Sequence, residues 1–523
     1  MVINYLHVRG ATKPLLKAIA GRAIFSFGVV IALTGCPLDG DDTVQVSSLS
    51  TQDEQLYRIM EQSDLAVDPS QNRTFPSIDD PIAQLGKKLF FTKSLSGEFD
   101  VACASCHHPM LGGSDELSLP VGVEAVQINV LGVGRKDGDG LPNVPRNSPT
   151  TFNVALWDQG LFWDSRVESL TKAADMNGEG GGISSPDSGF NIVDENGGDN
   201  LVSTQARFPI TSADEMKGHT FESEGDNTSV RDHLAARLGD YGIGLNELTS
   251  PEWLAEFQLA FDSDADAESL ITYDNIGLAL GEYQRSMVFV DTPWHRYLDG
   301  DLEAITAQQK AGALLFFLSV DEGGAGCVAC HNGDLFTDEQ NHAIGFPQIG
   351  EGKGNGTNGT DDFGRELVTG LESDRYKFRT PGLINVEVTF PYGHAGVYQT
   401  LEEAIRQHES PRDMVSAYFD AQQWCDLPQF IDVDVCADLY PEGRDNSLAA
   451  VSVVEAAQQS NTSLLQTRVL TDEERQQLVT FIQSLTDPCV KERACMAPWI
   501  AQEGDDDHDG QLLLATDAAG SPL

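Results

Sequence analysis

The stretch DVACASCHHPMLGG at residues 100–113 determines how the rest of this sequence is interpreted. It places two cysteines three positions apart, with a histidine directly after the second cysteine. The same Cys-x-x-Cys-His pattern returns in AGCVACHNGD at residues 325–334. The whole chain has 9 cysteines and 11 histidines among 523 residues, so two copies are not expected by chance. We therefore interpret both copies as sites for the same chemistry.

The Cys-x-x-Cys-His pattern is typical of the attachment site of a c-type haem. Its two thiols add to the vinyl groups of one haem, and the histidine binds the iron as the proximal ligand. A zinc ribbon would need further Cys or His pairs at finger spacing, and a redox dithiol would lie in a βαβ pattern. We predict two covalently bound haem c groups. The residues that hold them are Cys103, Cys106 and His107 in the first copy and Cys327, Cys330 and His331 in the second.

The two copies belong to a longer internal repeat. An apolar stretch with helical spacing precedes each copy, and Phe90 and Phe316 lie 13 and 11 residues before the first cysteine. A further amphipathic helix is predicted downstream in each half, at residues 275–289 and 471–485. The sequence therefore predicts a mainly α fold, in which two cytochrome c-like helical haem domains pack together with long loops.

These features divide the chain into five predicted segments. They are a lipoprotein-type signal peptide at 1–35, a flexible tether at 36–74, an N-terminal haem domain at 75–300, a C-terminal haem domain at 301–487 and an acidic tail at 488–523. Within the tail, GDDDHDG is similar to the first half of a calcium loop. Position 12 of that loop would be Thr516 in place of the usual glutamate, which leaves calcium binding by the tail open.

The first residues have the pattern of an export signal. Basic residues precede an apolar run at residues 23–35, which is too short to cross a bilayer comfortably. LTGC, ending at Cys36, is similar to the lipobox of bacterial lipoproteins, in which the cysteine is lipidated. We expect a periplasmic lipoprotein that is anchored to the outer membrane through this lipid alone. A plain cleaved signal is the alternative.

The other cysteines fit an oxidising compartment. Apart from Cys36 and the four haem-attachment cysteines, the chain has Cys425, Cys436, Cys489 and Cys495. The short separations favour two local disulfides, Cys425–Cys436 and Cys489–Cys495, although other pairings stay open. When these four cysteines form disulfides, no cysteine is left over as a nucleophile.

The charge balance bears on the partners. The chain has 33 Lys and Arg against 81 Asp and Glu, which gives a formal net charge of −48. Nucleic acid is therefore not expected as a partner. Solubility in a salty environment explains the acidity most simply, and an acidic docking surface for a basic partner protein is the alternative.

Several further segments resemble one family. They are VPRNSPTTFNVALWDQGLFWDSRVESL, QARFPITSADEM, FRTPGLINVEVTFPYGHAGVYQTLEEAIRQH and the closing helix, and the resemblance covers roughly residues 75–487. Together with the two haem-attachment motifs, they resemble the bacterial di-haem cytochrome c peroxidases and the related MauG-type enzymes, which use peroxide to oxidise a partner protein. The resemblance implies an oxidoreductase that acts on a peroxide. It also implies a peroxidatic haem in the N-terminal domain and an electron-transfer haem in the C-terminal domain.

The resemblance makes the His107 haem the peroxide site. Between His107 and Arg146 the strong ligands are His108 and Met110, and both are too close in sequence to reach the other face of the haem. Many family members carry a loop histidine here that must leave before peroxide binds. We therefore expect an open distal side, as in MauG-type enzymes.

A glutamate and a glutamine match the family's distal residues. Gln205 and Glu215 are 10 positions apart, as are the distal Gln and catalytic Glu of the family. A carboxylate near the peroxide can carry a proton from the inner to the outer oxygen, so Glu215 is the expected catalytic residue. Gln205 would position the peroxide. Without the resemblance, a glutamate in so acidic a chain is most simply a solvated surface charge.

The resemblance also assigns residues between the haems. Trp163 matches the tryptophan that lies there, which implies an electron relay, although a buried tryptophan can simply fill space. Asn147, Thr389 and Pro391 match positions that hold a calcium ion. One side-chain oxygen and two carbonyls are hard ligands of the kind that calcium prefers.

The second haem shows a departure from the family. Family members carry Met or Tyr where this chain has His408, which lies 77 residues past His331. TLEEAIRQHESP predicts a short helix with a capping box from Thr400 and Glu403 and with His408 on its apolar face. We expect His408 to be the second axial ligand of the His331 haem, and a satisfied core histidine is the alternative.

The interpretation that we prefer is a di-haem peroxidase that reduces hydrogen peroxide to water. Its electrons would come from a small cytochrome c or a copper protein. One alternative is a MauG-like enzyme that oxidises residues of a partner protein, and another is an electron-transfer cytochrome without catalytic activity. Family members are often dimers, so a homodimer also stays open.

Overall fold

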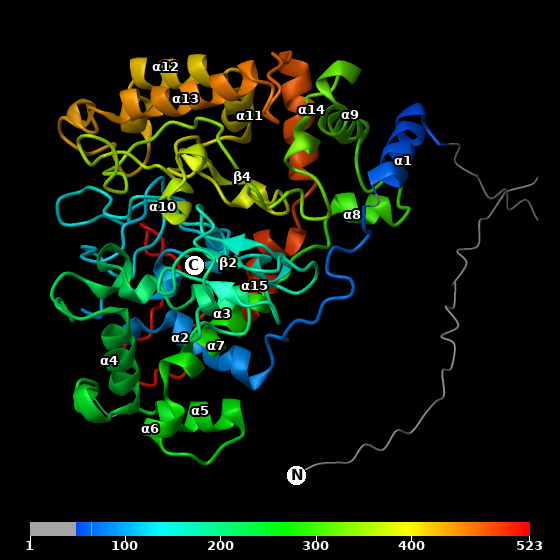
Figure 1. Cartoon of the computed structure of the whole chain (residues 1–523). Helices are drawn as coiled ribbons and strands as arrows, with labels where there is room; N and C mark the ends of the chain where they lie inside the picture. Colours follow the sequence, from blue (N-terminus) through cyan, green and yellow to red (C-terminus); the bar gives the residue numbers. More distant parts are fainter. Residues whose placement is uncertain (1–48, 64, 250) are drawn as a thin grey trace, which may run out of the picture. The chain divides into compact units, whose positions relative to one another are not determined.

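Two helix pairs, one in each half of the chain, are the main feature of the fold (Figure 1). In the first half α2 (Pro81–Phe91) packs on α7 (Tyr273–Arg285). In the second half α9 (Ala307–Phe317) packs on α14 (Asp472–Gln483). The computed structural model describes residues 49–63, 65–249 and 251–523.

A glycine lies at the closest approach of each pair. A Cβ atom on Gly86 would lie 1.9 Å from the carbonyl oxygen of Ala279, and one on Gly312 would lie 2.0 Å from that of Gln477. A side chain cannot occupy either position, so the two helix pairs depend on glycine for their close contact. The internal repeat in the sequence thus corresponds to a repeated helix crossing.

The other helices differ widely in length, and the strands have only two or three residues. The other helices are α1 (Thr51–Ser63), α3 (Leu201–Gln205), α4 (Asn227–Gly239), α5 (Trp253–Phe261), α6 (Ala267–Leu270), α8 (Pro293–Leu298), α10 (Glu366–Thr369), α11 (Leu401–Glu409), α12 (Pro411–Asp420), α13 (Gly443–Gln459) and α15 (Arg493–Met496). One antiparallel sheet has the order β1 (Gly160–Leu161), β2 (Val167–Ser169) and β3 (Ile183–Ser184). A second pairs β4 (Asn341–His342) with β5 (Phe378–Arg379).

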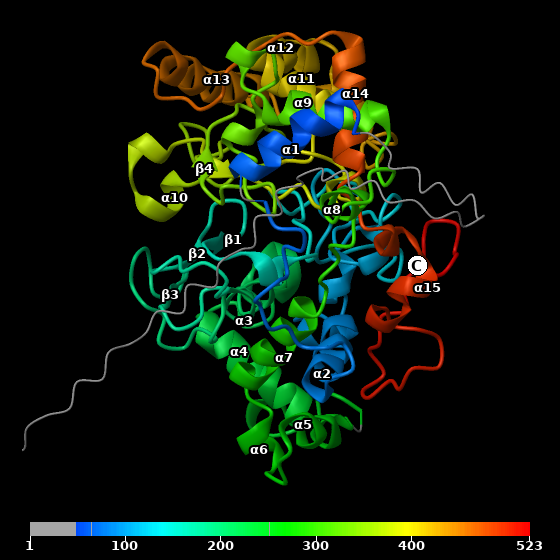
Figure 2. The same cartoon turned by 90° about the vertical axis from the view of Figure 1, so that its right-hand side faces the viewer.

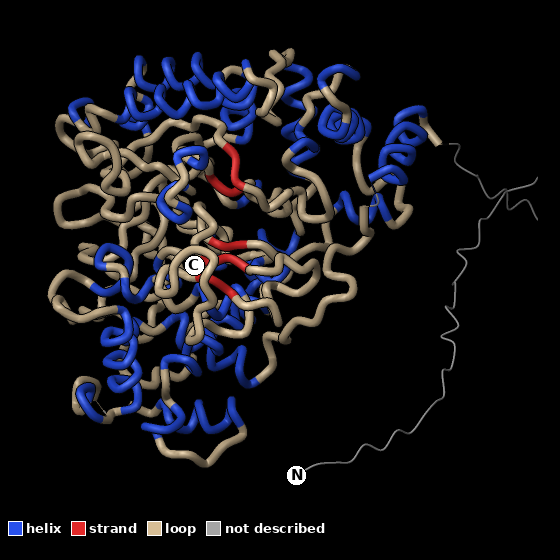
Figure 3. The backbone as a smooth tube through the Cα atoms, in the orientation of Figure 1, coloured by secondary structure: helices blue, strands red, loops and turns tan. Residues whose placement is uncertain are grey.

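The fold is mainly helical, as the sequence predicts, with few strands and long connecting loops (Figure 3). Figures 1 and 2 both place α9 and α11 to α14 toward one end of the described unit and α2 and α4 to α7 toward the other. Residues 49–523 nevertheless form a single unit by their contacts. The division into two haem domains therefore stays a prediction.

Local sequence signals explain where two important helices begin. The Thr471 side chain accepts a hydrogen bond from the backbone N–H of Glu474, and the Glu474 side chain completes the capping box of α14. Thr400 and Glu403 form the same arrangement at the start of α11. Both boxes satisfy backbone N–H groups that a helix start leaves without partners.

Part of the expected tether is a helix in the structure. α1 packs on α9, with Leu56 fully buried. Asp53 forms an ion pair of 2.8 Å with Lys310 and accepts a hydrogen bond from the Tyr297 hydroxyl. Burial opposes the charge of Asp53, but hydrogen bonds from Lys310, Ser50 and Tyr297 outweigh it and lower the pKa to about 2. The flexible tether that we expected at 36–74 is thus wrong for residues 51–63, because one face of this helix carries a carboxylate and a leucine that the second half buries.

The C-terminal segment returns to the first half of the chain. Leu513 N–H donates to the carbonyl of Phe91 at 2.8 Å, and Lys93 N–H donates to the carbonyl of Gln511 at 3.0 Å. Leu513 is fully buried in the core that surrounds α2. The acidic tail is therefore part of the packed fold.

The structure contains the disulfides Cys425–Cys436 and Cys489–Cys495. In the described part of the chain, no helix is long and apolar enough to span a membrane. The predicted signal peptide at 1–35 and the predicted lipid anchor Cys36 lie outside the described residues.

Candidate active site

Both Cys-x-x-Cys-His segments line one continuous cavity. All the residues to which the sequence assigned a haem, catalytic, relay or calcium role line it: Cys103, Cys106, His107, Asn147, Trp163, Gln205, Glu215, Cys327, Cys330, His331, Thr389, Pro391 and His408. The long loops of both halves therefore bring together positions that are hundreds of residues apart in the sequence.

The two predicted proximal histidines have the same local geometry. The Nδ1 atom of His107 lies 3.3 Å from the carbonyl oxygen of Gly113, and that of His331 lies 3.1 Å from the carbonyl oxygen of Phe336. Burial lowers the pKa of each histidine to about 4, so both rings are neutral. A neutral imidazole that donates from Nδ1 presents the lone pair of Nε2, which is the form that binds a metal.

A second imidazole faces His331. The ring centres of His331 and His408 are 6.5 Å apart. Two imidazoles that bind one metal from opposite sides, each with a bond of about 2 Å, place their ring centres about 6 Å apart. The Nδ1 atom of His408 lies 2.8 Å from the carbonyl oxygen of Ala404, which again leaves Nε2 for the metal. The pair fits a haem iron between the two rings.

No histidine or methionine of residues 108–146, which follow His107 in the sequence, lines the cavity. Neither His108 nor Met110 lines the cavity, and the buried His108 ring packs edge-on against Phe91. Met216 does line it, as part of the hydrophobic cluster that also contains Phe90. The two haem positions therefore have different surroundings.

Glu215 lies on a π-helical turn, η6 (Ala213–Lys217), that opens onto the cavity. The Ser212 hydroxyl accepts a hydrogen bond of 3.4 Å from the Glu215 N–H and caps this turn. π-Helical turns are rare and are found frequently at functional sites. Burial raises the pKa of Glu215, whereas the positive charges of Arg166 and Lys353 act in the opposite direction.

Residues that the sequence did not identify surround this carboxyl group. Arg146 forms buried ion pairs with Asp164 at 2.6 Å and with Asp362 at 2.7 Å. Arg166 and Lys353 line the cavity as well. Lys353 lies in the Gly-rich stretch 350–364, whose composition is typical of a surface loop. The sequence feature that could have indicated a role for Lys353 is that it is the single basic residue of this stretch.

Trp163 is held at the cavity by its neighbours. Its indole N–H donates to the carbonyl oxygen of Asn147 at 2.8 Å, and its own carbonyl accepts the N–H of Arg379 at 2.7 Å. Asn147 comes from the first half and Arg379 from the second. The indole is therefore fixed at the place where the two halves meet.

The predicted calcium ligands also lie close together. The Asn147 side-chain nitrogen is 2.6 Å from the carbonyl oxygen of Pro391. The other side-chain atom of Asn147, Oδ1, is buried and has no hydrogen-bond partner among the described residues. The reversed amide orientation would turn two oxygens toward each other, as binding of a hard cation requires. The residues present therefore fit a calcium ion.

In the calcium-like loop of the tail, by contrast, the oxygens that could bind a cation accept hydrogen bonds from the protein. An Asp507 oxygen accepts the N–H groups of Gly510 and Gln511, at 2.8 and 3.1 Å. The Lys93 ammonium donates to the carbonyl of Gln511 at 3.0 Å, and Asp509 accepts the indole N–H of Trp253. Groups that would bind a cation in such a loop thus have partners in the protein.

Comparison with known proteins agrees with this site. The family model described as di-haem cytochrome c peroxidase matches residues 80–303. The chain is 30% identical over 322 residues to the cytochrome c551 peroxidase of Pseudomonas aeruginosa, covering 62% of this chain and 70% of the relative. It is 31% identical over 355 residues to the methylamine utilization protein MauG of Methylorubrum extorquens, covering 66% of this chain and 75% of the relative.

A solved structure shows the same fold. It is that of a MauG-like protein associated with microbial copper homeostasis, with a TM-score of 0.51, 21% sequence identity, and coverage of 82% of this chain and 98% of that chain. Because the identity is low, this likeness concerns the fold alone. The two more similar relatives show that the chain belongs to the family of di-haem cytochrome c peroxidases and MauG, which implies two haem c groups.

Proposed function

We propose that this protein is a di-haem peroxidase that reduces hydrogen peroxide to water with two electrons from an external redox protein. The observation that carries the proposal is the difference between the two ends of the cavity. Glu215 and Gln205 line it together with His107, whereas His331 faces the second imidazole of His408. Such a difference suits one haem that binds peroxide and one that carries electrons.

The residues around His107 would manage protons. A bound haem supplies the iron chemistry that breaks the oxygen–oxygen bond. Glu215, as a carboxylate, accepts the proton of the inner peroxide oxygen and returns it to the outer oxygen, which leaves as water. Gln205 donates a hydrogen bond that orients the peroxide. Two protons and two electrons complete the reduction to a second water molecule.

The residues between the haems would connect them. His331 and His408 hold the second haem, and Trp163 relays electrons between the two sites. Asn147, Thr389 and Pro391 hold a calcium ion that fixes the segment beside Trp163. In this proposal residues 75–300 form the peroxidatic domain and residues 301–487 the electron-transfer domain.

The protein would work in the periplasm, attached to the outer membrane through a lipid on Cys36. Its electron donor would be a small cytochrome c or a copper protein. A MauG-like oxidation of a partner protein is the second candidate. It is favoured by the identity to MauG, which is as high as that to the peroxidase, and by the position of His108 away from the cavity.

The test is the peroxide-dependent oxidation of reduced cytochrome c by the holoprotein. We expect turnover that Glu215→Gln reduces roughly 100- to 10,000-fold, because removal of a positioned acid–base group has effects of this size. Glu224→Gln is the matched control, since Glu224 is exposed and nine positions further along the chain.

Three other results would contradict the role of Glu215 or favour a different function. Activity that Glu215→Gln leaves intact would contradict the role of Glu215. Peroxide consumption without donor oxidation would favour oxidation of a partner protein. A holoprotein that does not react with peroxide would be an electron-transfer cytochrome.

A further inference from the structure

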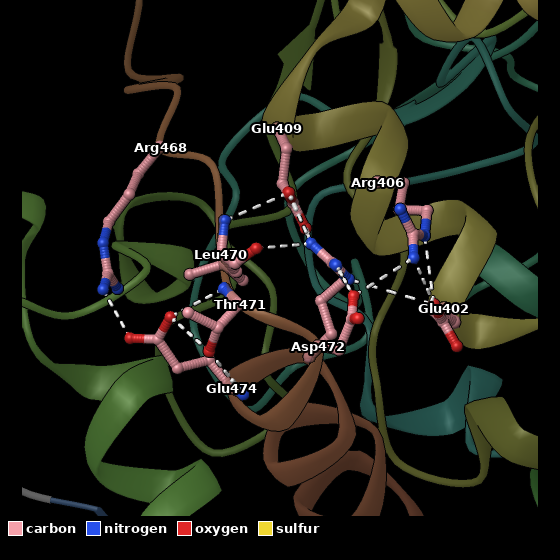
Figure 4. A network of polar contacts seen from close by, with 9 residues as sticks. Glu402, Arg406, Glu409, Arg468, Leu470, Thr471, Asp472 and Glu474 are labelled. Carbon is pink, nitrogen blue, oxygen red and sulfur yellow. Dashed lines mark hydrogen bonds and ion pairs between the residues drawn. The ribbon is translucent and has the colours of Figure 1, made fainter.

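A buried ion pair holds the end of the helix that carries His408 (Figure 4). Glu409 is the next residue, and it is only 8% exposed. Its carboxylate accepts hydrogen bonds from the Leu470 N–H and from the Arg475 guanidinium, each at 3.1 Å. Arg475 is 6% exposed and also donates to the carbonyl oxygen of Leu470 at 2.6 Å.

The first turn of the same helix is tied to the same place. Glu402 forms an ion pair with Arg406 at 2.8 Å and lies 3.8 Å from Arg475. Arg406 in turn lies 3.7 Å from Asp472, which also accepts from Arg475. α11 is therefore attached at both ends to the N-terminus of α14 through Arg475.

The adjoining residues reach the other side of the second haem position. Arg468 donates to the carbonyl oxygen of Gly324 at 3.2 Å and forms an ion pair with Glu474. Gly324 lies three residues before Cys327, in the loop that leads into the second Cys-x-x-Cys-His motif. Residues 468–475 thus contact both the segment that carries His408 and the segment that leads to His331.

The position of His408 makes such a contact necessary. His408 is the penultimate residue of a nine-residue helix, which ends at Glu409 before Pro411. Helix ends open more easily than helix centres, and a ligand there would dissociate easily unless something held it. Glu409 is adjacent in the chain, so an interaction that fixes Glu409 also limits the movement of His408.

We propose that Glu409 and Arg475 form a clamp that keeps His408 against His331, so that the second haem stays closed to external ligands. The clamp rests on the proposed function, because it assumes that His408 is the axial ligand. Arg475 is then a positioning residue that acts through Glu409. Without Arg475, the buried Glu409 carboxylate keeps the Leu470 N–H but loses its cationic partner, which favours movement of the end of α11 toward water.

Carbon monoxide binding to the reduced holoprotein tests the clamp. We expect the wild-type protein to bind one carbon monoxide per two haems, at the His107 haem. Arg475→Met should raise this number toward two and should convert part of the low-spin signal to a high-spin signal.

Two further variants keep the test decisive. Arg475→Lys retains the charge but has fewer donors, so it should fold and give an intermediate number of bound ligands. Arg412→Met is the matched control, because it breaks a solvent-exposed pair with Glu455 of 2.6 Å between α12 and α13. The control should bind one carbon monoxide, as the wild type does.

The results distinguish a failure of the clamp from a failure of the proposed function. If His408→Ala leaves the low-spin signal unchanged, or if the wild type binds two carbon monoxide molecules, the second haem is not held by His408. If the wild type and both Arg475 variants bind one molecule and share one spectrum, His408 is held without the clamp, and the inference is wrong.

Discussion

The charge on Glu215 depends on its neighbours. Burial raises the pKa of this carboxyl group, and the positive charges of Arg166, Lys353 and Arg146 lower it, while Asp214 raises it further. In the proposed mechanism Glu215 acts as a carboxylate, so the rate of the reaction with peroxide should fall as the pH falls through this pKa. The pH profile of the reaction therefore reports on the residues around Glu215.

Lys353→Met should shift that profile. Loss of a nearby cation disfavours the carboxylate and raises the pKa of Glu215, so the acidic limb should move to higher pH. Lys353→Arg should keep the wild-type profile, because the charge remains. The measurement is the rate of peroxide reaction against pH by stopped-flow spectroscopy. Lys136→Met, which breaks an exposed pair with Asp432, is the control, and an unshifted profile in Lys353→Met would refute this role.

His408 should determine the spectrum and the potential of the second haem. His408→Ala should turn one low-spin signal into a high-spin signal in electron paramagnetic resonance. His408→Met should raise the reduction potential of that haem, because methionine ligation raises it. His342→Ala is a suitable control, since His342 also lines the cavity but bonds to Asp338 at 2.7 Å. A potential that does not change in His408→Met would contradict ligation by His408.

At the scale of single elements, the helix crossings should tolerate no side chain. Gly86→Ala and Gly312→Ala each place a methyl group about 2 Å from a backbone carbonyl oxygen. We expect each to lower the free energy of unfolding by about 2 kcal/mol or more, because the helices must separate. Gly138→Ala meets no atom within 4 Å and is the control. Thermal unfolding of the three holoproteins checks this, and equal midpoints would count against the glycine crossings.

Sequence signals predict elements well where the cause is local. The Thr400 and Thr471 capping boxes mark the starts of α11 and α14, and the structure has both boxes. α1 was missed because its polar composition resembles a linker, and only a partner from the second half shows which face is buried. Lys353 was missed for a similar reason, because a Gly-rich composition does not indicate where a loop lies.

In the site, too, features with a local sequence signal are predictable, whereas contacts between distant residues are not. The residues to which the haem-attachment motifs and the family resemblance assign haem, catalytic, relay and calcium roles all line one cavity. The Arg146–Asp362 and Glu409–Arg475 ion pairs could not be predicted, since each joins residues far apart in the sequence. In a chain with 81 acidic residues, no sequence pattern indicates which carboxylates are buried.

At the scale of the whole molecule, the C-terminal segment supports the first half. Removal of residues 488–523 would expose the backbone of residues 91–93 and part of the core around α2. We expect faster hydrogen exchange in α2 of the shortened holoprotein. α9 and α14 should keep their protection and serve as the internal control. Unchanged exchange in α2 would show that the tail does not stabilise it.

The matching glycine crossings have a consequence for the origin of the molecule. Two units with the same helix contact and the same attachment motif are what duplication of one ancestral segment would leave behind. In such a history the two helix crossings would have stayed alike, whereas the short helical segments that carry Glu215 in one half and His408 in the other would have diverged. Different roles for the two copies would then require changes in these segments and no new architecture, and exchange of the segments is a route by which the roles could be reassigned.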